Sequence, residues 1–192
     1  MTQRISYRDY ADLDQEARGY LEHARDHGTP RPESQAVRAH VPAVLRAFSL
    51  AWRTTFHEGV TDHAVKELCR LYVSKTVECE YCGTQRSEIA RESGMDESKV
   101  DPLLDFERSD RYTDREKAAL RYAQAIVWDS SIADDELWSE LHQHFTEPEL
   151  VELGFFIGLT LGQQRWIKTL GIGHRQYMAA TEAGLAPDLT RS

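Results

Sequence analysis

Two cysteines separated by two residues, Cys79 and Cys82, are the side chains of this sequence best suited to redox chemistry. Their sulfur atoms can meet only where the chain turns tightly, and the start of a helix supplies such a turn. The run 78–93 has no proline and a single glycine, and Gly94 follows it, so the sequence predicts a helix that begins near Cys79. Amide groups at a helix start favour a thiolate over a thiol, and the thiolate is the reactive form.

Two charged residues flank the pair at spacings that suit thiol chemistry. Arg86 follows Cys82 by four residues, so on one helix its guanidinium shares a face with the sulfur and lowers the thiol pKa. Cys82 is therefore the predicted attacking sulfur and Cys79 its resolving partner. Glu67 lies beside an apolar stripe, and a partly buried carboxylate with a raised pKa could accept the thiol proton. An exposed glutamate, or an ion pair with Arg86, is the alternative interpretation of Glu67.

Other uses of a CxxC pair fit this sequence less well. A structural zinc site needs four ligands, and no second CxxC or HxxxH follows at the usual spacing, although His57 and His63 are near. The thioredoxin arrangement needs a strand before the motif, whereas a helix is expected there. His23 and His27 lie four apart with only Glu22 beside them, which favours a solvated helix face. We therefore predict no metal and no cofactor, with accidental cysteine spacing as the remaining alternative.

Composition limits the classes of partner. The chain has 192 residues and a formal charge of −9, without a basic block of five or more residues, so nucleic acid and anionic membranes are poor partners. This length favours a single domain. The N-terminus runs directly into charged residues without an apolar signal segment, so we expect a cytoplasmic protein in which a disulfide can cycle.

Hydrophobic periodicity predicts an all-α fold, a single-domain bundle of about seven or eight helices, because no convincing strand alternation occurs. Capping signals at Thr61 or Asp62, Thr113 and Thr146 mark three of the helix starts. The expected helices are 7–27, 42–59, 61–76, 78–93, 96–104, 113–128, 134–145 and 147–169. Gly154, Gly158 and Gly162 share one face of the last helix, which predicts the close approach of another helix, within the bundle or from another subunit.

A glutamate, eleven intervening residues, a CxxC pair and a polar position four residues beyond it form a pattern in this helical chain. With Glu67, Cys79 and Cys82 at these positions, the chain resembles the alkyl hydroperoxidase D (AhpD)-like branch of the carboxymuconolactone decarboxylase family. The resemblance implies residues 33–173 as an AhpD-like helical domain, 1–32 as a helical extension and linker, and 174–192 as a C-terminal tail. It also implies a homo-oligomer, a trimer or hexamer.

The resemblance further implies a peroxidase activity on hydroperoxides. Cys82 would attack the peroxide, Cys79 would resolve the sulfenic acid to a disulfide, and Glu67 would be the activating base. A dithiol partner such as a lipoylated protein would reduce the pair. The family pattern has a histidine where this chain has Arg86, and arginine stabilises a thiolate but relays no proton near neutral pH. The alternatives are therefore a CxxC redox switch or binding protein without fast turnover, and a decarboxylase-like enzyme acting on a small carboxylic acid.

Overall fold

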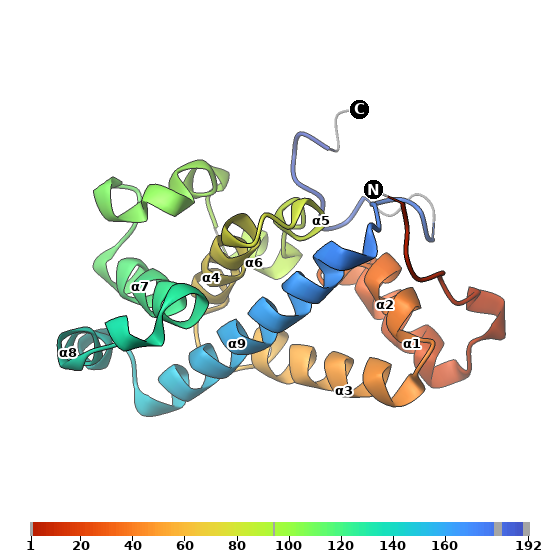
Figure 1. Ribbon diagram of the computed structural model, residues 1–192, viewed down its shortest axis with the longest axis horizontal. Helices are drawn as coiled ribbons and strands as arrows, with labels where there is room; N and C mark the ends of the chain where they lie inside the picture. The colour runs from red at the N-terminus through yellow and green to blue at the C-terminus, as the bar shows by residue number, and fades with distance from the viewer. Residues whose placement is uncertain (1, 94, 179–181, 190–192) are drawn as a thin grey trace.

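The computed structural model describes residues 2–93, 95–178 and 182–189, and in this part of the chain the regular structure is helical (Figure 1). The only β pairing among these residues is an isolated bridge between Gln85 and Leu185, so the all-α prediction is confirmed. The α-helices are α1 (Gln15–His27), α2 (Pro32–Arg38), α3 (Pro42–Trp52), α4 (His63–Thr76), α5 (Glu80–Gly83), α6 (Glu88–Glu92), α7 (Asp114–Trp128), α8 (Asp135–His144) and α9 (Glu147–Leu170).

Side-chain caps set several of these boundaries. The Asp62 carboxylate accepts hydrogen bonds from the amides of Ala64 and Val65 and starts α4. Capping boxes at Thr113 and Thr146 start α7 and α9, as the sequence predicts. The first helix begins later than expected, because Asp14 caps it and the preceding residues form a separate 3-10 turn.

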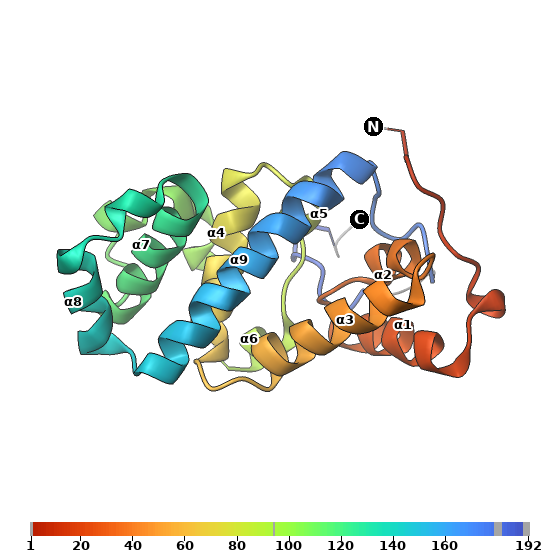
Figure 2. The ribbon, with the colours of Figure 1, turned by 60° about the horizontal axis from the view of Figure 1, so that its bottom comes forward.

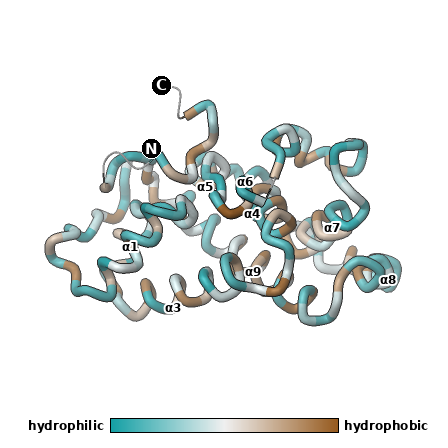
Figure 3. Tube along the Cα trace, turned by 180° about the vertical axis from the view of Figure 1, so that it is seen from behind, coloured by the Kyte–Doolittle hydropathy of each residue, from teal (hydrophilic) through white to brown (hydrophobic). Residues whose placement is uncertain are grey.

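Helices α4, α7 and α9 pack against one another and hold the largest apolar cluster, which α8 and the 3-10 segment 101–108 cover. In Figures 1 and 2, α9 crosses the molecule between the α7–α8 side and the α1–α3 side. Hydrophobic and hydrophilic segments alternate along α4 and α9 in Figure 3, whereas α8 is largely hydrophilic. No helix of the described ranges is both long and apolar enough to traverse a lipid bilayer.

The glycine face of α9 is only partly covered. A Cβ at Gly154 would meet the Tyr122 hydroxyl at 2.5 Å, which explains that glycine, whereas nothing in the described chain lies within 4 Å of one at Gly158 or Gly162. Next to these glycines Phe155 is 55% exposed. The homo-oligomer therefore stays a prediction, with this face of α9 as the surface that it would use.

The segment after α9 packs back onto the chain. Gly28, at a φ of +74°, has its backbone against that of Gly184, so that neither position leaves space for a side chain. Leu185 and Ala186 are buried. The predicted domain limits stay a prediction, but residues on both sides of them lie together in the structure.

Candidate functional site

Cys79 and Cys82 are joined by a disulfide, with their Cα atoms 5.2 Å apart. The tight turn expected between them is α5, a single helical turn that Cys79 begins. Both cysteines are almost sealed from solvent, at 2% and 3% exposure. They pack in a small apolar cluster that includes Ile167, Leu170 and Ile172. The third cysteine, Cys69, lies in the main core, where burial raises the pKa of its thiol, so the redox candidates are the paired cysteines.

The single helix expected over 78–93 is wrong. Helix α5 ends at Gly83, and α6 begins only at Glu88. Between them the chain is extended because its backbone pairs with the C-terminal segment, where the Ala186 amide donates to the Thr84 carbonyl over 2.8 Å. Without a helix from the cysteines onward, the one-turn spacing between sulfur and guanidinium no longer applies, and a helix of one turn provides little macrodipole.

Arg86 is instead held by other partners. Its Nη2 donates to a carboxylate oxygen of Glu97 over 2.6 Å, and its Nη1 donates to the Gly83 carbonyl over 2.7 Å. The guanidinium is nearly buried. These contacts tie the extended segment to the 3-10 turn at 97–99, and a direct effect of Arg86 on the Cys82 thiol stays a prediction.

Glu67 is fully buried, and its partner is a residue that the sequence reading missed. Arg70 donates from Nε and Nη2 to the two carboxylate oxygens of Glu67, over 2.6 and 2.8 Å. The Ser87 amide donates to the same carboxylate over 2.9 Å. The alternative of an ion pair between Glu67 and Arg86 is therefore wrong, because Arg70 lies one turn along the same helix. The i,i+3 spacing of Glu67 and Arg70 was the signal that could have indicated this pair.

Arg70 connects this buried ion pair to the cysteine turn. Its Nη1 donates to the Cys82 carbonyl over 2.9 Å, and its Nη2 also donates to the Gln85 carbonyl over 2.8 Å. Glu67 thus fixes Arg70, and Arg70 fixes the backbone that carries the second cysteine. This arrangement assigns Glu67 a positioning contact, while its predicted role as base for the thiol stays a prediction.

Cys82 lines a small space, here called the inner cavity, of about 30 Å³. Its walls include Arg38, Trp52, Arg70, Thr160 and Gln164. The guanidinium of Arg38 lies 3.6 Å from the centre of the Phe48 ring, and burial lowers the pKa of Arg38 to about 9, which leaves it cationic at neutral pH. A buried cation in a cavity beside a thiol favours the thiolate.

Three polar atoms of the inner cavity residues have no partner within the described chain. They are Nε of Arg38, Oγ1 of Thr160 and Oε1 of Gln164, all buried. Buried polar groups are usually hydrogen-bonded, and leaving one unsatisfied costs about 1–3 kcal/mol. The cavity has room for about one water molecule or two bonded oxygen atoms. Residues that carry unpartnered polar atoms therefore lie around the space next to Cys82.

Cys79 faces a different space, here called the outer groove, of about 400 Å³. Its walls include Tyr81, Thr84, Ile167, Lys168 and His174. Cys79 lines this groove but not the inner cavity, and Cys82 lines the inner cavity but not this groove. His174 stacks on Tyr81 with ring centres 4.4 Å apart. The hydroxyl of Tyr81 donates to Glu33, and burial together with that carboxylate raises the Tyr81 pKa.

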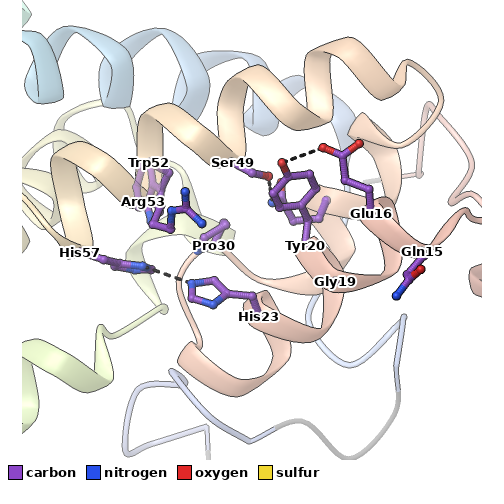
Figure 4. Close-up of a pocket in the computed structure, with 11 residues that line it drawn as sticks. Gln15, Glu16, Gly19, Tyr20, His23, Pro30, Ser49, Trp52, Arg53 and His57 are labelled. Carbon is purple, nitrogen blue, oxygen red and sulfur yellow. Dashed lines mark hydrogen bonds between the residues drawn. The ribbon is translucent and has the colours of Figure 1, made fainter.

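A third space of about 320 Å³ lies between α1 and α3 and is drawn in Figure 4. It shares Pro30 and Trp52 with the inner cavity, so these residues separate the two. The Trp52 indole donates to the Thr29 carbonyl over 3.1 Å, which holds this wall in place. Gly19 lies in the α1 wall, and a Cβ there would meet nothing within 4 Å.

Histidines form the other end of this α1–α3 pocket. His23 and His57 point toward each other in Figure 4, with their ring nitrogens 3.3 Å apart, and His27 stacks on His23. Burial, together with the neighbouring His23, lowers the pKa of His57 to about 3. The expectation of a solvated face for His23 and His27 holds only in part, because both side chains are half-buried in contact with the ring of His57. In the described ranges, no three potential ligands are grouped so as to hold a metal ion.

Comparison with known sequences finds a family match for one segment of the chain. Residues 42–125, from α3 into α7 and including the CxxC pair, match the carboxymuconolactone decarboxylase family. The fold of the protein is of the AhpD-like type. An uncharacterized protein of Mycobacterium tuberculosis is 30% identical over 132 residues, which are 69% of this chain and 42% of that protein. YnjA of Escherichia coli, also uncharacterized, is 31% identical over 98 residues, 51% of this chain and 54% of its own.

Solved structures share the fold at lower identity. The debrominase Bmp8 superimposes with a TM-score of 0.75 at 20% identity, over 88% of this chain and 90% of its own, and one of its structures is a Cys→Ala variant with 2,3,4-tribromopyrrole. A peroxidase-related protein of Ralstonia eutropha, described as an alkylhydroperoxidase AhpD core, has a TM-score of 0.76 at 19% identity, over 89% of this chain and 91% of its own. The family and these neighbours carry the names of enzymes, while the chain spans only about half the length of its curated relatives.

Proposed function

We propose that this protein is a thiol peroxidase that reduces hydroperoxides with its CxxC pair. The observation that supports this most is the setting of Cys82, which lines a small cavity together with the buried cation Arg38 while its partner cysteine is within disulfide distance. A peroxidatic cysteine needs these features: a stabilised thiolate, polar contacts for two oxygen atoms, and a second thiol.

The reaction balances without any further cofactor. The Cys82 thiolate attacks the terminal oxygen of ROOH, the O–O bond breaks, and RO⁻ takes up a proton to leave as ROH, so that Cys82 becomes a sulfenic acid. The Cys79 thiol then attacks this sulfur, water leaves, and the disulfide forms. A dithiol of the lipoyl type would restore both thiols.

The inner cavity suits the reacting oxygens better than it suits a whole organic hydroperoxide. Arg38 and Gln164, which line this cavity, each have a buried polar atom without a partner, and we propose that these atoms contact the two oxygens. The neighbouring α1–α3 pocket, at about 320 Å³, is at the lower end of the volumes typical of small-molecule sites. We propose that an organic substituent lies in this pocket, across the wall formed by Pro30 and Trp52.

The test is a stopped-flow measurement of disulfide formation when an organic hydroperoxide is mixed with the reduced protein. The native protein should react within seconds or faster and consume one peroxide per disulfide. Cys82→Ser should consume none, whereas Cys69→Ala, at the cysteine outside the site, should behave as the native protein does. Hydroperoxide consumption by Cys82→Ser at the native rate would exclude the mechanism.

A CxxC redox switch without fast turnover is the second candidate, and the engagement of Arg86 with Glu97 is the observation that favours it. Arg86 replaces the family histidine, and both cysteines are nearly sealed. A switch would form the disulfide over minutes, with a change in subunit assembly or partner binding. Slow oxidation in the same stopped-flow measurement, followed by a shift in sedimentation coefficient, would support the switch over the peroxidase.

A further inference from the structure

A histidine from the C-terminal segment stands in the outer groove with one ring nitrogen unused. His174 follows α9 by four residues and stacks on Tyr81, one of the two residues between the cysteines. Its Nδ1 is buried and has no hydrogen-bond partner. Because His174 lies 92 positions after Cys82, no motif around the cysteines could indicate it.

The hydrogen bonds around His174 determine its tautomer. The Thr84 hydroxyl donates its single hydrogen to the Glu80 carbonyl over 2.8 Å, as threonines near a helix end often do. The same hydroxyl oxygen lies 2.7 Å from Nε2 of His174, and with the hydroxyl hydrogen on the Glu80 carbonyl we assign Nε2 as the donor in that contact. A neutral imidazole with its hydrogen on Nε2 has its lone pair on Nδ1. The unpartnered atom is therefore a proton acceptor.

The charges around the ring keep it neutral. Burial, with smaller effects of Arg31 from the turn before α2 and of the adjacent Arg175, lowers the pKa of His174 to about 4. A hydrogen bond to the Tyr81 backbone acts in the opposite direction. At neutral pH the imidazole is thus available to accept a proton, and an incoming thiolate would stabilise the imidazolium that results.

We propose that His174 is the proton acceptor for a dithiol reductant that enters the outer groove and attacks Cys79. This inference rests on the proposed function only in its assumption that the pair cycles. Cys79 lines the groove whereas Cys82 lines the inner cavity, so the reductant meets the resolving sulfur and the peroxide meets the attacking sulfur. Apolar side chains such as Ile167 beside the open groove fit a dithiol on an extended apolar arm.

The exchange balances in electrons and protons. The first thiol of the reductant gives its proton to Nδ1, and its sulfur attacks Cys79, so that the disulfide breaks and Cys82 leaves as a thiolate. The second thiol loses its proton to solvent and attacks the mixed disulfide, which releases Cys79. Cys79 takes the proton from His174, and the reductant leaves as a cyclic disulfide. The pair is reduced by two electrons and the dithiol is oxidised by two.

The test separates the two half-reactions. Protein oxidised with diamide, which does not depend on any peroxidase activity, is mixed with dihydrolipoamide across the pH range. His174→Gln retains a donor for Thr84 but lacks a base, so we expect reduction about 100-fold slower at neutral pH. Below the pKa of the reductant thiol, the reduction rate of His174→Gln should fall tenfold for each unit by which the pH is lowered. The reduction rate of the native protein should fall less steeply. Peroxide oxidation of the reduced variant should stay within twofold of the native rate.

Two further variants make the outcome decisive. His142→Gln, at an exposed histidine of α8, should reduce at the native rate. Thr84→Val removes the contact that fixes the tautomer and should slow reduction by a smaller factor. Native reduction kinetics in His174→Gln, or an equal loss in both half-reactions, would overturn the assignment. If His174→Gln does not fold, unchanged reduction by Thr84→Val overturns it. If peroxide oxidises neither the native protein nor the variants, while the reduction of His174→Gln is still slowed, only the proposed peroxidase function would be excluded.

Discussion

The two sulfur atoms of one disulfide face two different environments. The inner cavity at Cys82 is small, about 30 Å³ in volume, and buried residues line it, among them the cation Arg38. The outer groove at Cys79 is larger, about 400 Å³, and a neutral histidine lines it. A small buried space suits a small oxidant, and a larger groove suits a larger thiol. The comparison suggests that a CxxC pair can separate its oxidant from its reductant by placing each sulfur in its own cavity.

The strongest test of this separation is Cys79→Ser. We expect the variant to react once with a hydroperoxide and to stop at the Cys82 sulfenic acid, because no thiol remains to resolve it. Turnover should be lost completely, and a sulfenic-acid probe with mass spectrometry should label Cys82 alone. Labelling at Cys69, or continued turnover, would contradict the assigned roles.

The backbone that carries Cys82 should be sensitive to Glu67→Gln, because Glu67 fixes Arg70 and Arg70 contacts the Cys82 carbonyl. Loss of the carboxylate leaves Arg70 charged and buried, which costs about 3–5 kcal/mol of unfolding free energy. Urea unfolding measures this loss, with Glu92→Gln at an exposed site of α6 as the control. Full stability together with slow oxidation would instead support Glu67 as the proton acceptor of the thiol.

Arg38→Met should affect the inner cavity alone. We expect the pKa of the Cys82 thiol to rise by about one unit or more when the nearby cation is removed, with slower oxidation as a result. Reduction by dihydrolipoamide should remain within twofold of native. The thiolate absorbance of the reduced protein as a function of pH measures the first effect, and Arg46→Met on the exposed side of α3 is the control. An equal effect on both half-reactions would argue against two separate environments.

The smallest effect is expected at Gly19, in the α1 wall of the α1–α3 pocket. Gly19→Ala should stabilise the helix by up to about 1 kcal/mol. The peroxidase kinetics should stay unchanged, because the added Cβ has no other atom within 4 Å. Gly19→Trp should fill the pocket and raise KM several-fold for cumene hydroperoxide but not for hydrogen peroxide. Unchanged kinetics with both substrates would place the organic substituent elsewhere.

The sequence by itself determined the features that depend on neighbouring residues. Helix caps at Asp62, Thr113 and Thr146 are local hydrogen bonds, and the CxxC spacing itself requires a tight turn. The position of Glu67 beside an apolar stripe correctly indicated burial. These interactions span four residues or fewer, or follow from one helical period, so their signals are present in the sequence.

Only the tertiary structure decided how the site is built. The run after Cys82 leaves the helix because its backbone pairs with residues 184–186, and local propensity contains no information on that pairing. Arg38 and Gln164 reach the inner cavity from helices distant in sequence, and His174 reaches the outer groove from beyond α9. Contacts between distant segments are set by the packing of the whole chain. The two environments of the disulfide are therefore a product of the fold.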